Sequence, residues 1–170
     1  MTFLLCLGSV APTFAADKKK GFDASAKHAI AVEATTGKIL YEKDAHKRMY
    51  PASTTKIVTA YIALQKLNLT DQVTASKTAI SIPSDSSKMG ILEGETLTVE
   101  ELLYALMVQS ANDAANVLAE AVSGSISEFV TLMNETAQDL GMNDTNFANP
   151  HGYHDDNHYT TAYDLYLIFN

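Results

Sequence analysis

The stretch 50-YPASTTKIVTAYIALQKL-67 places Ser53 and Lys56 three residues apart at the head of an almost wholly apolar run. Pro51 and Ser53 are helix-start signals. The apolar residues cover most of the helix circumference, so the sequence predicts a central, buried helix from Ser53 to Leu67. A lysine at the head of such a helix is unfavourable unless something uses its amine or the amine reaches solvent. Both the fold and the chemistry of the chain therefore depend on this stretch.

Ser53 and Lys56 form a possible nucleophile and base. Positions i and i+3 share one face of a helix, so the lysine amine can reach the serine hydroxyl. A serine hydroxyl needs a base to act as a nucleophile. Burial and the positive end of a helix dipole both lower a lysine pKa, and the unpaired N–H groups of a first helical turn can hold an oxyanion. An S-x-x-K pattern alone also arises by chance, so the rest of the chain must support this interpretation.

A second polar motif, Ser110-Ala111-Asn112, lies between two predicted helices. A serine in such a turn is usually a helix cap. It could instead relay a proton between Lys56 and a leaving group. Asn112, with one carbonyl and one amide group on its side chain, could then orient a substrate amide.

The first 16 residues, MTFLLCLGSVAPTFAA, read as a signal peptide with a cut after Ala15 or Ala16. The apolar run is shorter than the roughly 20 residues that span a membrane. It lacks a basic head, which suggests that its start is truncated. Cys6 is the only cysteine, so the cut product would contain no disulfide, cysteine metal site or thiol nucleophile. The alternative is a cytoplasmic protein with an apolar N-terminus.

The bulk composition limits the class of protein. The chain has 170 residues, about one domain, and 46% of them are hydrophobic, which is enough for a core. Its formal net charge of −8 argues against a nucleic-acid partner, which requires a basic surface. The sequence contains no internal repeat and no low-complexity segment.

Periodicity and turn signals predict a hairpin followed by helices. Gly37 can adopt a positive φ, which favours a tight connection between two short strands. Thr98 and Glu101 form a capping box, and Gly141 is a helix stop signal. The expected elements are strands at Ala29–Glu33 and Lys38–Glu42, helices at 99–107, 114–122 and 126–140, a last helix from about 160, and irregular chain over 70–97.

The end of the sequence suggests an incomplete domain. The last predicted helix stops at Asn170 while its residues are still apolar, with no cap. Two strands alone are marginal, so the hairpin needs further strands to pair with. The expectation is an α+β domain that lacks its later strands.

Taken together, the motifs PASTTK, SAND and NPHGYHDDNHYTTAYDL resemble those of the D-alanyl-D-alanine carboxypeptidases, the low-molecular-weight penicillin-binding proteins. The lead-in TTGKILYEKDAHKRMYPASTTK is also similar to that family, and the resemblance covers residues 28–170. It implies a β-lactamase/transpeptidase-like fold, with helices packed on an antiparallel sheet. Residues 17–170 would then be the N-terminal part of the catalytic domain.

The resemblance also implies roles for four residues. Ser53 would be the acylated nucleophile, Lys56 the general base, Ser110 the proton relay and Asn112 a substrate-positioning residue. The substrate would be a peptidoglycan stem peptide ending in D-Ala-D-Ala, and β-lactam antibiotics would be covalent inhibitors. No cofactor, metal or nucleic acid would be needed. The protein would be exported to the cell-wall side of the membrane.

One motif of the family is missing. The sequence has no K-T-G, and Thr36-Gly37-Lys38 has the wrong order and lies in the hairpin turn. In the family this motif lies on a later strand that holds the substrate carboxylate. We therefore expect a fragment that lacks this strand and any C-terminal membrane anchor, and that is inactive by itself.

Three alternatives stay open. A zinc site is possible at His151, His154 and His158, with Asp155 and Asp156. The Asn, Pro and Gly residues around them instead favour a solvated loop beside the cleft. The resemblance suggests that His158 and Asp164 help to shape this cleft. A class A-like β-lactamase shares the serine and lysine, yet residues 141–170 contain no glutamate to hold a deacylating water. A non-catalytic penicillin-binding sensor would keep the motifs without turnover.

Overall fold

The computed structural model describes residues 24–169. The predicted signal peptide over residues 1–16, including Cys6, lies outside this range, so the expectations about it stay predictions. Within the described part of the chain, no helix is both long enough and apolar enough to cross a membrane.

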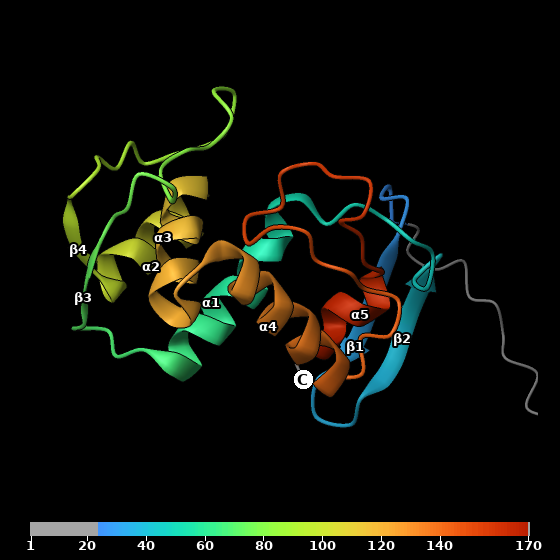
Figure 1. Ribbon diagram of the computed structural model, residues 1–170. Helices are drawn as coiled ribbons and strands as arrows, with labels where there is room; N and C mark the ends of the chain where they lie inside the picture. The colour runs from blue at the N-terminus through green and yellow to red at the C-terminus, as the bar shows by residue number, and fades with distance from the viewer. Residues whose placement is uncertain (1–23, 170) are drawn as a thin grey trace, which may run out of the picture.

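Helix α1 (Thr55–Lys66) is the central element, as the sequence predicts (Figure 1). Its residues Ala60 and Ala63 belong to one apolar core and its residues Val58 and Ile62 to another, so the helix lies between the two. The helices that pack against it are α2 (Val99–Val108), α3 (Asn112–Ser123) and α4 (Ile126–Asp139).

The start and the burial of α1 differ from the prediction. Ser53 lies in a 3-10 turn, η1 (Ala52–Thr54), and the α-helix begins two residues later. Tyr61 and Leu64 are 37% and 55% exposed, so the apolar surface of α1 is not buried all round. Periodicity identified the helix, but it could not show which apolar side chains would find a neighbour.

The other helices begin and end at their local signals. Thr98 caps α2, and its side chain and that of Glu101 form both hydrogen bonds of the capping box. Gly124 ends α3 in the left-handed conformation, with φ 79°. The last helix, α5 (Ala162–Leu167), begins after the Thr161 cap and packs against the first strand.

Two small antiparallel sheets flank the helices. Strands β1 (Ala29–Glu33) and β2 (Lys38–Lys43) form the predicted hairpin, with Gly37 at φ 69°. Strands β3 (Gln72–Thr74) and β4 (Thr96–Thr98) form a second sheet in the segment expected to be irregular, so that expectation is wrong at its two ends. Three-residue strands are too short to show an alternating pattern in the sequence.

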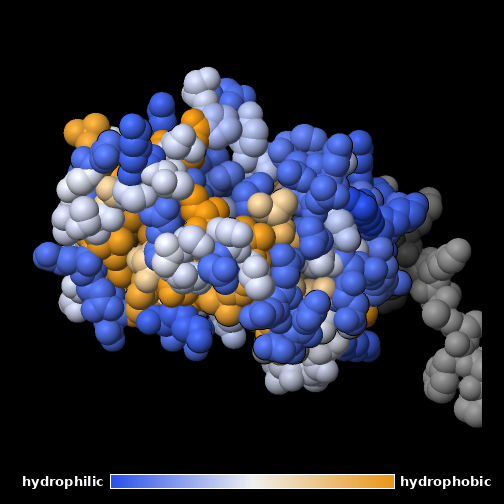
Figure 2. Space-filling view, in the orientation of Figure 1, coloured by the Kyte–Doolittle hydropathy of each residue, from blue (hydrophilic) through white to orange (hydrophobic). Residues whose placement is uncertain are grey.

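The architecture is α+β, with a helical part and a hairpin part joined by a long connection. Figure 1 shows residues 141–160 crossing between α4 and the hairpin before the chain enters α5. On the face in Figure 2, apolar side chains gather over the helical part, whereas hydrophilic side chains cover the end with β1, β2 and this connection. The start of α1 lies where the two parts meet.

Candidate active site

The structure brings Ser53, Lys56 and Ser110 together. Lys56 Nζ donates a hydrogen bond to Ser53 Oγ over 3.3 Å, because η1 leads directly into the first turn of α1. Ser110 Oγ donates to Ser53 Oγ over 2.9 Å from the turn between α2 and α3. The Ser53 hydroxyl thus lies between the amine of Lys56, three residues away in the sequence, and the hydroxyl of Ser110, which is 57 residues away.

The polar residues at the start of α1 hold the histidine loop, which we define as residues 149–158. Lys56 Nζ donates to the His151 carbonyl over 2.7 Å. Thr59 Oγ1 donates to the Pro150 carbonyl over 2.6 Å, and Thr55 Oγ1 lies 2.8 Å from His158 Nε2. These contacts explain why a helix with two apolar cores carries three buried polar side chains at its start.

Burial shifts the charge state of Lys56. The side chain is 2% exposed, and this desolvation lowers the lysine pKa from 10.5 to about 8. The same burial, reinforced by the nearby Lys56 charge, lowers the pKa of His151 to about 4. Near neutral pH His151 is therefore neutral, and a useful fraction of Lys56 can lose its proton.

Both segments that carry the serines contain a residue in the left-handed region. Ala52 has φ 49° and Ser110 has φ 56°, and Asp44 is the one other non-glycine residue with positive φ in the described part of the chain. Such backbone conformations are costly for residues with a Cβ and cluster at functional sites. Here they lie immediately before Ser53 and at its hydrogen-bond partner.

Asn112 lies at the first residue of α3 and is 5% exposed. Its backbone N–H donates to the Ser87 carbonyl over 2.9 Å. Among residues 24–169, it makes no hydrogen bond to Ser53, Lys56 or Ser110. Asn112 is therefore linked to Ser53 and Lys56 only through the chain, because Ser110 lies two residues before it, and not by a direct hydrogen bond.

Asp113 was not identified from the sequence, although it follows Asn112 directly. Its buried carboxylate accepts hydrogen bonds from the backbone N–H groups of Met89, Gly90 and Ile91 at 3.0, 2.8 and 3.1 Å. These bonds tie the segment around residue 90 to the start of α3. The signal for this role is an acidic residue in the first turn of a helix, which is too common to be specific.

Gly152 brings the histidine loop against the nucleophile turn. It has φ +85°, and a Cβ at this position would lie 1.7 Å from the Ala52 carbonyl oxygen. Only glycine permits both this backbone angle and this approach. The sequence indicated a turn here but not its contact with residue 52, 100 positions earlier.

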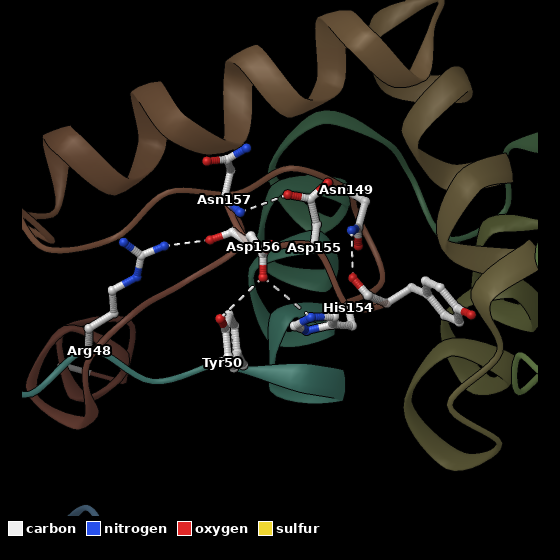
Figure 3. Close-up of polar contacts among 8 residues, drawn as sticks. Arg48, Tyr50, Asn149, His154, Asp155, Asp156 and Asn157 are labelled. Atoms are coloured by element: carbon white, nitrogen blue, oxygen red, sulfur yellow. Dashed lines mark hydrogen bonds and ion pairs between the residues drawn. The ribbon is translucent and has the colours of Figure 1, made fainter.

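The outer side of the histidine loop is held by its own polar contacts (Figure 3). Asp156 accepts a hydrogen bond from Tyr50 Oη over 3.4 Å and lies 3.6 Å from His154 Nε2. Arg48 donates to the Asp156 carbonyl and lies over the ring of Tyr159. These contacts fix the loop in an irregular conformation, which confirms the predicted loop.

The three histidines of this loop have different surroundings. His151 and His158 are buried, whereas the His154 side chain is 64% exposed. Within the described part of the chain, no three His, Cys, Asp or Glu residues lie in an arrangement that could hold a metal ion. Asp164, which was expected near the site, accepts hydrogen bonds from Asp144 N–H and Thr145 Oγ1 and so stabilises the approach to the loop.

Tyr153 links the histidine loop to the segment beside Asn112. Its hydroxyl lies 3.1 Å from one carboxylate oxygen of Asp85, and this contact raises the tyrosine pKa. Ser87, two residues after Asp85, bonds to the Gln109 carbonyl through its hydroxyl and to Asn112 N–H through its carbonyl. The Tyr153–Asp85 contact thus joins the histidine loop to the segment that also bonds to Gln109 and Asn112.

The sequence is similar to those of known D-alanyl-D-alanine carboxypeptidases. Residues 13–170 match the family described as D-alanyl-D-alanine carboxypeptidase, peptidase S11. The chain is 39% identical over 148 residues to D-alanyl-D-alanine carboxypeptidase DacF of Bacillus subtilis, covering 84% of this chain and 38% of the relative. It is 36% identical over 148 residues to DacC of Escherichia coli, covering 82% of this chain and 37% of the relative. The chain thus spans less than two fifths of the length of these relatives.

The fold is also similar to solved structures. D-alanyl-D-alanine carboxypeptidase DacD from Francisella tularensis superposes with a TM-score of 0.83 at 37% identity, covering 87% of this chain and 37% of that one. Penicillin binding protein 5 from Haemophilus influenzae superposes with a TM-score of 0.82 at 35% identity, covering 88% and 45%. The expected α+β, transpeptidase-like fold is therefore confirmed. From its sequence, its fold and the grouping of its motifs, the chain belongs to the D-alanyl-D-alanine carboxypeptidase family, peptidase S11.

Proposed function

We propose that the chain carries the nucleophile and base of a serine-type D-Ala-D-Ala carboxypeptidase. The observation that supports this most is the position of Ser53 Oγ, which accepts hydrogen bonds from both Lys56 Nζ and Ser110 Oγ. A buried lysine with a pKa of about 8 is a base that can work near neutral pH. The substrate would be a peptidoglycan stem peptide, and residues 17–170 would supply the N-terminal part of the catalytic domain.

The reaction would begin with proton transfer from Ser53. Lys56, once neutral, takes the hydroxyl proton as Ser53 Oγ forms a bond to the carbonyl carbon of the penultimate D-alanine. The C–N bond to the terminal D-alanine then breaks, and Ser110 passes the proton from Lys56 to the leaving amine. Water hydrolyses the resulting ester and regenerates Ser53. Asn112 would orient the substrate amide from the start of α3.

A β-lactam would acylate Ser53 by the same first step, because its strained amide presents the same carbonyl. The ring opens, but the amine stays attached, so the acyl-enzyme persists and can be labelled. We further propose that the protein acts outside the cytoplasm, in agreement with the predicted signal peptide over residues 1–16 and with the cell-wall substrate.

The test is acylation of Ser53 in the protein produced from the complete reading frame that encodes this chain. We expect a fluorescent penicillin to label the wild type and not Ser53→Ala, which removes one hydroxyl and should leave the thermal melt unchanged. Ser127→Ala, an exposed serine in α4, is the matched control and should label normally. Labelling of Ser53→Ala at the wild-type level would overturn the assignment.

Two further assays separate the alternatives. Release of D-alanine from a D-Ala-D-Ala peptide is expected of a carboxypeptidase and not of a penicillin-binding sensor. Rapid turnover of nitrocefin would instead indicate a β-lactamase. The absence of glutamate from residues 141–170 favours slow deacylation.

A further inference from the structure

His158 is a buried histidine that the proposed reaction does not use. It is 2% exposed and lies edge-on to Phe147, with ring centroids 5.6 Å apart. Its Nδ1 lies 3.0 Å from Ala148 N–H and its Nε2 lies 2.8 Å from Thr55 Oγ1. Both ring nitrogens are therefore engaged inside the protein.

These partners determine the tautomer. A backbone N–H can only donate, so Nδ1 must accept from Ala148 and the ring proton must sit on Nε2. Nε2–H then donates to Thr55 Oγ1. Burial lowers the pKa of His158 to about 4, so the ring stays in this neutral form near pH 7.

Thr55 connects this histidine to the reactive residues. It is fully buried and lies between Ser53 and Lys56 in the chain, at the first residue of α1. The histidine loop thus forms two hydrogen bonds with the start of α1: His158 bonds to Thr55, and the His151 carbonyl bonds to Lys56. Both contacts join the same loop to the same helical turn, so we expect the loss of the first to shift the second.

We propose that His158 is a positioning residue for the acylation step, which holds Lys56 in reach of Ser53 by fixing Thr55 against the histidine loop. This inference rests on the proposed function, in which Lys56 is the base. Displacement of a reacting group by about 1 Å can reduce a rate by about 100-fold, so a contact that touches no substrate can still control the reaction.

The test is a double-mutant cycle on acylation by a penicillin, in the protein from the complete reading frame. His158→Phe keeps the ring volume but removes both hydrogen bonds, and we expect the acylation rate constant at saturating penicillin to fall at least tenfold, with little change in the half-saturating concentration. His158→Gln keeps an amide donor that can bond Thr55 Oγ1, so it should stay within about threefold of wild type. Thr55→Val should lose as much as His158→Phe, and the double variant should lose no more than either.

His46→Phe is the control, because His46 is exposed and stacks on Tyr163 in the hairpin part of the molecule. Wild-type acylation by His158→Phe, or losses that add in the double variant, would overturn the proposal. If His158→Phe does not fold, Thr55→Val, which replaces the hydroxyl with a methyl group of similar size, carries the same prediction.

The tautomer gives a readout that does not depend on catalysis. We expect ¹⁵N NMR of the His158 ring to show a protonated Nε2 and an unprotonated Nδ1 from pH 5 to 8. Protonation at Nδ1 would overturn the proposal even if acylation occurs. A wild type that shows this tautomer but does not acylate would overturn the proposed function, and with it the role of His158 in catalysis.

Discussion

At Lys56, burial lowers the pKa of the amine, and the proposed role as a base requires the same change. The side chain is 2% exposed, and the loss of hydration destabilises its ammonium form, which lowers the pKa to about 8. The His151 carbonyl, 2.7 Å from Nζ, fixes the amine without neutralising it. A carboxylate in this place would have raised the pKa and removed the base. The site thus favours a lysine that is both fixed and able to lose its proton.

This environment predicts the pH dependence of acylation. Only neutral Lys56 accepts the Ser53 proton, so the acylation rate should rise with pH and level off above about 8, where the lysine is mostly deprotonated. In Lys56→Arg the guanidinium stays charged, and we expect the acylation rate to fall by about 10²–10⁴. The rate should also no longer rise with pH. Stopped-flow acylation between pH 6 and 9.5 would measure both effects.

The control is Lys66→Arg, which changes an exposed lysine at the other end of α1 and should leave the profile unchanged. If Lys56→Arg kept most of its activity, Lys56 would be a structural cation and not the base.

At the scale of elements, the histidine loop has no regular structure but is tightly positioned. Its ends are anchored by backbone pairs between Met49 and Thr160 and between Asn146 and Tyr159. Its inner side bonds to α1 through the Pro150 and His151 carbonyls. The Pro150 and His151 carbonyls are therefore positioned by contacts at both ends of the loop and along its inner side.

Gly152 should be the most sensitive position of this loop. In Gly152→Ala, the new Cβ would meet Ala52 O at 1.7 Å and Thr55 Oγ1 at 2.9 Å, so the loop must move away from the start of α1. We expect penicillin labelling to fall more than tenfold and the melting temperature to drop, because the Lys56–His151 contact breaks. Labelling kinetics and differential scanning calorimetry would measure the two effects.

Gly141→Ala separates the clash from the backbone angle. Gly141 also has positive φ, at +79°, but a Cβ there would meet nothing within 4 Å. That variant should lose only the roughly 1–2 kcal/mol of a left-handed alanine and should label normally. Equal effects of the two substitutions would show that the close approach at Gly152 has no role.

The elements that could be predicted from the sequence are those defined by local signals. The hairpin around Gly37, the Thr98–Glu101 capping box and the helix stop at Gly141 each depend on a few neighbouring residues, and the structure contains all three. The S-x-x-K spacing likewise predicted the contact between Ser53 and Lys56. The sequence was sufficient to predict a contact wherever both interacting residues lie within one turn of the chain.

The contacts that the sequence could not predict join distant segments. The partner of Lys56 is a backbone carbonyl 95 residues later, and a carbonyl carries no residue-specific signal. Thr55 and His158 are 103 residues apart, and either could have been an ordinary surface residue. The role of Gly152 depends on the approach of Ala52, which periodicity does not encode. Such contacts follow from the packing of whole elements.

At the scale of the whole molecule, the junction between the helical part and the hairpin part contains an unusual set of buried titratable groups. Lys56, His151 and His158 are each at most 8% exposed, and all three have pKa values lowered by burial. Each therefore resists protonation in the folded state. The stability of the domain is thus linked to the proton concentration through the same contacts that build the site.

The two histidines predict a loss of stability in mild acid. Their pKa values are near 6.5 in the unfolded chain and about 4 in the folded protein, so between these values the unfolded state binds more protons. The free energy of unfolding should therefore fall as the pH drops from 6.5 to 4, by up to about 3 kcal/mol for each histidine. The chain has no tryptophan, so urea unfolding followed by far-UV circular dichroism is the suitable measurement.

His158→Gln isolates one of the two contributions, because glutamine does not titrate and the carboxylates that also respond to acid are common to both proteins. Its free energy of unfolding should decrease less steeply than that of the wild type over this pH range, with the two curves converging towards pH 4. The change in the difference between the curves from pH 6.5 to pH 4 measures the cost of keeping His158 neutral in the folded protein. Parallel curves would mean that the His158 ring is protonated as readily in the folded as in the unfolded state, which is incompatible with a buried ring whose Nδ1 accepts from Ala148 N–H.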